Sequence, residues 1–198
     1  MTTTSVSSTP TEEHLTELFD ALTYVMGEEG LSRTIVAHLR DCFRLDAIER
    51  IRASTDLAIV LSEMHPYLDD STVCLIGIQA ILAIMGRFTS EIIVIRTAFR
   101  ALRNIVHNHE TNADILVTKL GGIPFLAERM KQFHADADAM KNACWMLRNL
   151  SCFEQLRKQI VDAKALSALA SAFDFDGHKD NPAIQKPARQ AIFMLVSD

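Results

Sequence analysis

The stretch Ala98-Phe-Arg-Ala-Leu-Arg-Asn-Ile105 recurs 45 positions later as Ala143-Cys-Trp-Met-Leu-Arg-Asn-Leu150. Alanine, leucine, arginine and asparagine coincide in the two stretches, and isoleucine stands over leucine. The same shift places Gly77-Ile78 under Gly122-Ile123, and a further 45 positions bring Ala188 under Ala143. Self-similarity at a fixed period is the signature of repeat architectures. The sequence therefore predicts an array of units about 45 residues long.

Apolar residues at helical spacing account for the rest of the chain. No stretch alternates apolar and polar residues over a useful length, and the scarcity of glycine (7) and proline (5) disfavours an all-β sandwich or barrel. We expect many helices joined by short turns, which is typical of a helical bundle or an α-solenoid. The expected helices span 11–28, 56–64, 71–88, 90–107, 112–120, 123–133, 137–152, 154–163, 166–175 and 182–196, with others starting at Ser32 and Asp46.

Two registers of the repeat stay open between residues 54 and 90. A shift of 66 aligns Gly77 and Ile81 with Ala143 and Leu147, which would make 71–86 the third helix of a unit. The shift of 45 makes the same segment a second helix and leaves no helix unassigned. We therefore prefer the 45-residue register, with three helices in each unit.

The composition limits the class of protein. Of 198 residues, 48% are hydrophobic and 23% charged, close to the globular average. A chain of this length buries roughly 70% of its unfolded surface, so it can form a core without disulfide or metal cross-links. These values exclude a wholly disordered chain, a collagen and a disulfide scaffold. The net charge of −5 and the pI of about 5.8 disfavour a dedicated nucleic-acid binder, which would usually be basic.

Two motifs resemble the armadillo repeat. Gly121-Gly-Ile-Pro-Phe-Leu126 is similar to the opening of that repeat's second helix, and Ala143-x-Trp-x-Leu-x-Asn-Leu-Ser151 resembles its third helix. Residues 155–163 are similar to the first helix of a following unit. The resemblance is clearest over 110–163, and it implies an all-α, right-handed α-solenoid of about three repeats. Third helices of armadillo proteins line a concave groove that binds extended peptides or partner proteins.

The resemblance suggests how the chain is organised. Residues 1–9 are rich in serine and threonine, and we expect a disordered tail there. We expect an N-terminal helical cap over 10–53, because these apolar faces need a partner but lack the repeat pattern. The repeats would occupy 54–198, divided near 54–109, 110–152 and 153–198.

The expected helix over 137–152 separates a core face from a polar face. Ala143, Leu147 and Leu150 share one face at helical spacing, whereas Trp145 and Asn149 lie on the other. An asparagine amide can donate to and accept from a peptide backbone, and an indole ring can stack on aliphatic or cationic side chains. Residues in the same relation on the three third helices make up the predicted binding groove: Arg96, Arg100, Arg103, Asn104, His107, Lys141, Trp145, Arg148, Asn149 and Gln190.

Each of these residues also has a structural interpretation. Trp145 could pack between repeats, and Asn104 and Asn149 could bond the backbone of a neighbouring repeat. The arginines could form a solvated helix face, as charged runs usually do. The sequence leaves these alternatives open beside the groove.

The spacing of Trp145 and Asn149 is similar to the one by which importin-α grips basic localisation signals. Arg100 replaces the tryptophan in the preceding unit, and Gln190 and Met194 replace both residues in the following unit. A mostly cationic stripe does not suit a basic peptide. We therefore expect a protein or peptide partner of acidic or polar character, and no nucleic acid.

The sequence carries no enzyme signature, so we expect a non-enzymatic scaffold or adaptor with no catalytic residue, cofactor or metal. His107 and Glu110 could share a face, but no third ligand follows, and 174–180 departs from the calcium-loop order. Phosphate-loop and nucleophile-elbow motifs do not occur. The alternatives are a regulatory or structural subunit of a larger complex that assembles through its solenoid ends, and an enzyme on a helical scaffold. Self-association through the C-terminal repeat is a further expectation.

Cysteine spacing and the N-terminus indicate the compartment. Cys42, Cys74, Cys144 and Cys152 form no CxxC pair, so we expect reduced thiols packed as small hydrophobic residues. The N-terminus lacks the regions of a signal peptide, and the most apolar stretch, 73–85, is too short to span a bilayer. We expect no membrane insertion and a cytoplasmic location, with the nucleus as the alternative.

Overall fold

The computed structural model describes residues 41–197. The chain divides into two compact units, residues 1–45 and 46–198. Residues 41–45 are the described part of the first unit, and they are helical. The expected tail, the expected helix over 11–28 and most of the expected cap lie outside the described residues.

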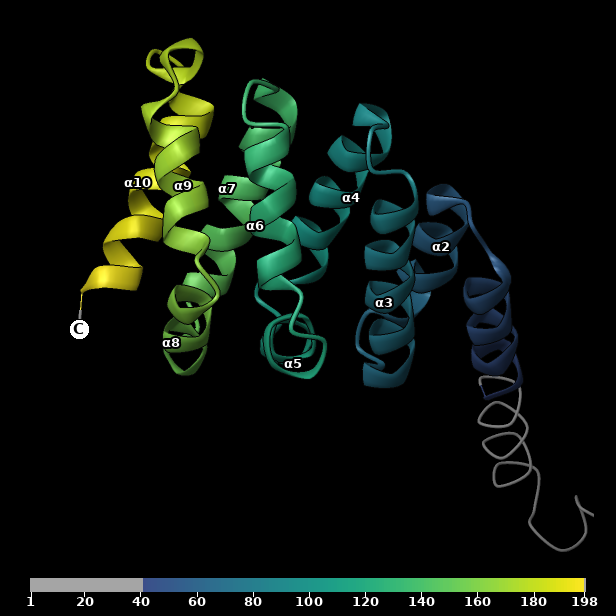
Figure 1. The fold of residues 1–198 in the computed structure, drawn as a ribbon. Helices are drawn as coiled ribbons and strands as arrows, with labels where there is room; N and C mark the ends of the chain where they lie inside the picture. Colours follow the sequence, from purple (N-terminus) through teal and green to yellow (C-terminus); the bar gives the residue numbers. More distant parts are fainter. Residues whose placement is uncertain (1–40, 198) are drawn as a thin grey trace, which may run out of the picture. The chain divides into compact units, whose positions relative to one another are not determined.

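The second unit is all-helical, with no strand among its described residues. It opens with helical residues 46–53. The elements that follow are α2 (Leu57–Met64), the 3-10 turn η1 (His65–Tyr67), α3 (Ser71–Arg87), α4 (Ile92–Ile105), α5 (Glu110–Asp114), the π-helical η2 (Ile115–Lys119), α6 (Ile123–Gln132), α7 (Ala137–Ser151), α8 (Glu154–Asp162), α9 (Ala165–Asp174), the 3-10 turn η3 (Asp176–His178) and α10 (Pro182–Val196) (Figure 1). The predicted all-α class is confirmed.

Short polar side chains fix where several helices begin. Asp70 accepts hydrogen bonds from two backbone N–H groups at the start of α3, and Asp136 accepts one at the start of α7. Asn181 does the same at the start of α10. Such N-caps satisfy amides that the first helical turn leaves without a partner. The starts of these helices are therefore encoded locally.

Two helices differ from their predicted bounds by two residues or more at one end or both. The helix predicted over 90–107 begins at Ile92 and ends at Ile105, because the chain then turns through Asn108, whose φ is +56°. The helix predicted over 112–120 begins at Glu110 and widens after Asp114 into η2. Gly121 ends this segment with a φ of +56°, a conformation that glycine adopts without strain.

The helices α4, α7 and α10 lie side by side (Figure 1). α7 packs against α4 and against α10. α6 contacts α9, and both of these helices also contact α7. The start of α4 meets the start of α7 through Arg96 and Asp136, and its end meets the end of α7 through Arg103 and Asn149. α4 and α7 therefore run in the same direction, as the repeat predicts. A continuous apolar core extends through all of these helices.

Side-chain hydrogen bonds between described elements that are far apart in the sequence reproduce the period of the sequence. They join residues 39 to 46 positions apart, close to the shift of 45 that aligns the sequence with itself. The pairs are Leu68–Asn112, Thr89–Gln132, Arg96–Asp136, Arg103–Asn142, Arg103–Asn149, Glu110–Gln155, Thr118–Gln159 and His134–His178. Equivalent positions of successive segments are thus neighbours in space, as in a helical repeat.

Candidate functional site

The polar face of α4 carries half of the predicted groove residues. Ile95, Phe99 and Leu102 are fully buried on the opposite face, which recurs at helical spacing and fixes how α4 is turned. On the polar side and in the turn that follows, Arg96, Arg100, Asn104 and His107 are exposed, and Arg103 is half-buried.

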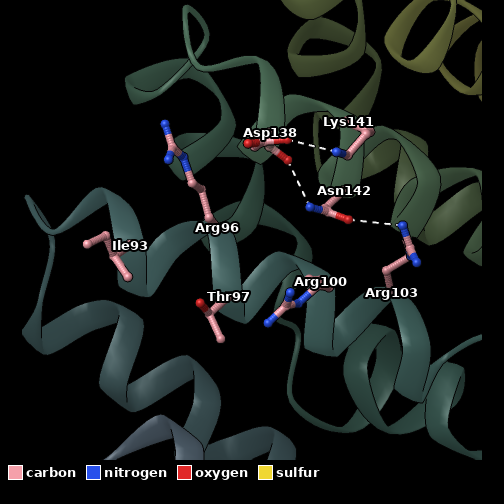
Figure 2. A pocket seen from close by; sticks show the side chains of 8 residues that line it. All are labelled: Ile93, Arg96, Thr97, Arg100, Arg103, Asp138, Lys141 and Asn142. Atoms are coloured by element: carbon pink, nitrogen blue, oxygen red, sulfur yellow. Dashed lines mark hydrogen bonds and ion pairs between the residues drawn. The ribbon is translucent and has the colours of Figure 1, made fainter.

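A cavity of about 360 Å³, here called the basic cavity, opens between α4 and the first turns of α7 (Figure 2). Four cations and one carboxylate line it, together with Ile93, Thr97 and Asn142. The charged lining residues are Arg96, Arg100, Arg103, Lys141 and Asp138. The lining therefore has a net positive charge in a protein whose total charge is −5.

Arg96 is neutralised by a carboxylate at the start of α7. Its Nε donates to Asp136 Oδ1 at 2.9 Å, and its Nη2 pairs with Asp136 Oδ2. Asp136 also accepts from the Ala139 N–H at 2.8 Å. The bond from Arg96, with a smaller contribution from the backbone N–H, holds the pKa of Asp136 below its ordinary value. Arg96 thus ties α4 to the cap of α7.

Arg103 faces amide oxygens. Its Nη1 donates to Asn142 Oδ1 at 3.0 Å, and its Nε donates to Asn104 Oδ1 at 3.2 Å. Asn142 in turn donates to the Asp138 backbone carbonyl at 2.9 Å, while Lys141 donates to the Asp138 carboxylate at 2.7 Å (Figure 2). The Asp138 carboxylate therefore offsets the positive charge of Lys141, whereas the Arg103 guanidinium donates to neutral amide oxygens.

Arg100 is exposed, and it forms no hydrogen bond or ion pair within the described part of the chain. Figure 2 shows its guanidinium at the basic cavity with no interaction to the other residues drawn. An arginine fork presents donors that match a carboxylate or phosphate. Arg100 and Arg103 together thus provide an uncompensated positive charge at this cavity.

A second cavity, of about 330 Å³, lies further along the same two helices and is here called the tryptophan cavity. It is lined by Arg103, Asn104, His107, Trp145 and Asn149. Trp145 is half-buried, so its ring is partly accessible. The Arg148 guanidinium carbon lies 5.8 Å from the centroid of that ring, within cation–π range.

Asn149 is 6% exposed, so its side chain is buried although the sequence places it on the polar face of this helix. Its Nδ2 donates to the Arg103 backbone carbonyl at 3.3 Å. Arg103 lies in the last turn of α4, where carbonyls lack partners inside the helix. The alternative that the sequence left open for Asn149, a bond to the neighbouring backbone, describes this contact. Asn112 acts similarly, because its Nδ2 donates to the Ile105 carbonyl at 3.2 Å.

The structure brings most of the predicted residues together but not all. Arg148 adjoins Trp145 without lining either cavity, and Gln190 is half-buried on α10, away from the two cavities. Sequence reasoning missed Asp138 and Asn142, which shape the basic cavity. Asp138 could have been found as the i−3 partner of Lys141. Asn142 gave no signal, because its role depends on an arginine 39 positions earlier.

The described residues contain no group of three or more histidine, cysteine or acidic side chains that could hold a metal ion. Burial raises the pKa of Cys74 to about 11 and of Cys144 to about 12, so both thiols are protonated. The predicted packing of thiols as small hydrophobic residues holds for these two, whereas Cys152 is exposed. Among the described helices, none has the length and apolar character needed to cross a membrane.

Comparison of the chain with protein-family models, with curated proteins and with solved structures found no match.

Proposed function

We propose that this chain is a non-enzymatic protein-binding scaffold with an armadillo-type α-solenoid fold. In this proposal about three repeats occupy residues 54–198, and an extended peptide of acidic or polar character lies along α4 and α7. The basic and tryptophan cavities are the parts of the groove that the peptide contacts.

The repeat part of the proposal is supported by two glycines. A Cβ atom on Gly77 would overlap the Met64 side chain of α2, and one on Gly122 would come within 2.9 Å of the Leu116 side chain of η2. Both glycines stand where a second helix passes close to the preceding first helix. The 45-residue register aligns these two positions, whereas the 66-residue register does not, so the contacts favour the former.

The observation that carries the binding proposal is the state of the cations at the basic cavity. Arg96 and Lys141 are each paired with a carboxylate, but Arg100 has no partner among the described residues and Arg103 faces amides. Arginines on a merely solvated helix face need not line a cavity. Here Arg100 and Arg103 line the basic cavity, and Arg103 also lines the adjacent tryptophan cavity. A carboxylate-bearing peptide complements that arrangement.

The test is selection from a displayed library of random peptides. The purified full chain should enrich acidic peptides, whose affinity is then measured by fluorescence anisotropy. Arg100→Glu should weaken binding roughly tenfold or more, because it reverses an unpaired charge at the site. Arg52→Glu makes the same change of net charge at an exposed residue outside both cavities and should leave affinity unchanged.

Added salt should weaken the same binding, because exposed charges are screened over about 10 Å at ~0.1 M ionic strength. Enrichment of basic or uncharged peptides, or equal affinities of the two variants, would refute the proposed groove.

A second candidate function is a structural subunit that assembles through α10. Phe193 is 68% exposed and Val196 is 61% exposed on this helix, which is unusual for large apolar side chains that lie so close together. If this surface mediates self-association, the chain sediments as an oligomer, and Phe193→Asp converts it to a monomer. A wild-type chain that sediments as a monomer at high concentration argues against this candidate.

A further inference from the structure

A third cavity, here called the apolar slot, lies between α2 and α4. Its volume is about 260 Å³, more than the ~150 Å³ that suffices to hold a benzene ring in a protein interior. The apolar lining consists of Leu61, Met64, Leu68, Ala101 and Ile105. Leu61 and Leu68 are half-buried, so part of their surface faces the slot. The space suits an apolar side chain of the size of leucine.

The rim of the slot is polar. His65, Arg100 and Asn104 are exposed and line it together with the apolar residues. Arg100 also lines the basic cavity, and Asn104 also lines the tryptophan cavity. The slot therefore shares Arg100 with the basic cavity and Asn104 with the tryptophan cavity, so it borders the proposed groove.

The charge at this rim limits what the slot can accept. A purely apolar partner would leave Arg100 desolvated without an acceptor, which is unfavourable. A partner that brings a carboxylate beside its apolar side chain satisfies both features. In an extended peptide, residues i and i+1 point to opposite sides and residues i and i+2 to the same side, about 7 Å apart. Acidic and apolar side chains two residues apart can therefore reach the basic cavity and the slot together.

We infer that the peptide partner carries a leucine-like residue two positions from an acidic residue, and that this side chain enters the apolar slot while a carboxylate faces Arg100. The inference rests on the proposed function and adds to it the rule by which one acidic peptide is distinguished from another.

The experiment uses the tightest-binding acidic peptide from the library selection and its twin, in which the apolar residue is replaced by serine. Binding of both to the full chain is measured by fluorescence anisotropy. On the wild type, the twin should bind roughly tenfold to a hundredfold more weakly, as expected for losing the burial of one leucine. Leu61→Ala should weaken binding of the parent peptide but not of the twin, because the twin has no apolar side chain to place in the slot.

Ile59→Ala is the matched control, since Ile59 lies on the same helix, is 45% exposed and lines none of the three cavities. It should leave the ratio of the two affinities unchanged. Leu68→Ala tests the slot from its other wall if Leu61→Ala lowers the melting temperature too far for a binding assay.

The outcomes separate this inference from the proposed function. The slot inference would be wrong, and the proposed groove unaffected, if the selected acidic peptides showed no fixed apolar position. The same would follow if the twin bound more weakly than the parent peptide by the same factor in both slot variants as in the wild type. A selection that yields no acidic peptide would overturn both. The inference would be supported if the affinity difference between the two peptides disappeared in a slot variant and persisted in Ile59→Ala.

Discussion

Trp145 and Asn149 lie one turn apart on α7, yet their surroundings give them different roles. Asn149 is buried and bonds the last turn of α4. Trp145 is half-buried at a cavity wall beside Arg148. We therefore expect Asn149 to contribute mainly to stability and Trp145 to contribute mainly to binding.

Asn149→Ala should lower the free energy of unfolding by about 1–2 kcal/mol, because the Arg103 carbonyl loses its donor from α7. Chemical denaturation monitored by circular dichroism measures the change. Asn104→Ala is the control: Asn104 is exposed, and within the described residues its side chain bonds only the adjacent Arg103 side chain, so its loss should change stability by less than about 0.5 kcal/mol. Equal costs for the two variants would contradict the capping role of Asn149.

Trp145→Ala should weaken binding of the selected acidic peptide by about 2 kcal/mol or more, as truncation of an aromatic anchor does. The half-buried ring should contribute less to folding, so the melting temperature should fall only modestly. Anisotropy and thermal denaturation of the same preparation test the two effects together. A stability loss of about 3–5 kcal/mol, typical of a fully buried aromatic residue, would place Trp145 in the core instead.

At the scale of elements, the helix α3 contains two glycines in contrasting positions. A side chain on Gly77 would overlap the fully buried Met64 side chain, whereas nothing lies within 4 Å of the Cβ position of Gly86. Close approach of α2 and α3 therefore depends on the first glycine and not on the second.

Gly77→Ala should destabilise the protein by about 1–3 kcal/mol, because the buried Met64 side chain must move. Gly86→Ala should stabilise it by up to about 1 kcal/mol, because alanine is the better helix former and meets open space. Urea denaturation of the two variants gives opposite signs if α2 and α3 pack as described. A stabilising Gly77→Ala would show that these helices do not approach closely at this point.

Asp136 joins two elements, since it caps α7 and pairs with Arg96 of α4. Its pKa is lowered in the folded state, so its contribution is present above the ordinary carboxyl pKa of about 4 and is lost as the pH falls. Asp136→Ala should cost about 1 kcal/mol near pH ~7, the typical effect of losing an N-cap, and progressively less below pH ~4. Unfolding free energies measured across this range test the trend.

Asp180→Ala provides the control for pH, because Asp180 is exposed and has no hydrogen bond or ion pair within the described residues. Its effect should be small at every pH. A cost for Asp136→Ala that stays constant down to pH ~3 would show that the carboxylate charge does not contribute.

At the scale of the whole molecule, residues 46–53 form part of the continuous apolar core of the second unit. Ile48 and Ile51 are 5% and 0% exposed, and Arg50 pairs with Glu63 of α2 at 2.9 Å. A fragment of residues 54–198 should therefore melt at a lower temperature and aggregate, because it exposes the apolar surface that these residues cover. Deletion of residues 1–9 should leave the melting temperature nearly unchanged, since this stretch is serine- and threonine-rich. A fragment 54–198 as stable as the full chain would refute the cap.

The sequence by itself determined the helices and their buried faces. Apolar spacing and residues such as Asp136 and Asn181 act within a few positions of the chain, so the starts of α7 and α10 and the core positions Leu102 and Leu147 followed from local patterns. The period of 45 was also visible, because equivalent segments face similar surroundings and keep similar residues.

Only the tertiary structure decided which polar residues remain available to a ligand. Arg96, Asn142 and Asn149 are used by contacts to positions 39 to 46 residues away, and no local pattern shows how closely α4 and α7 approach. Arg100, in contrast, forms no hydrogen bond or ion pair within the described residues, and its sequence neighbours do not reveal this. The apolar slot likewise lies between α2 and α4, so it is a property of packing between helices and not of either helix alone.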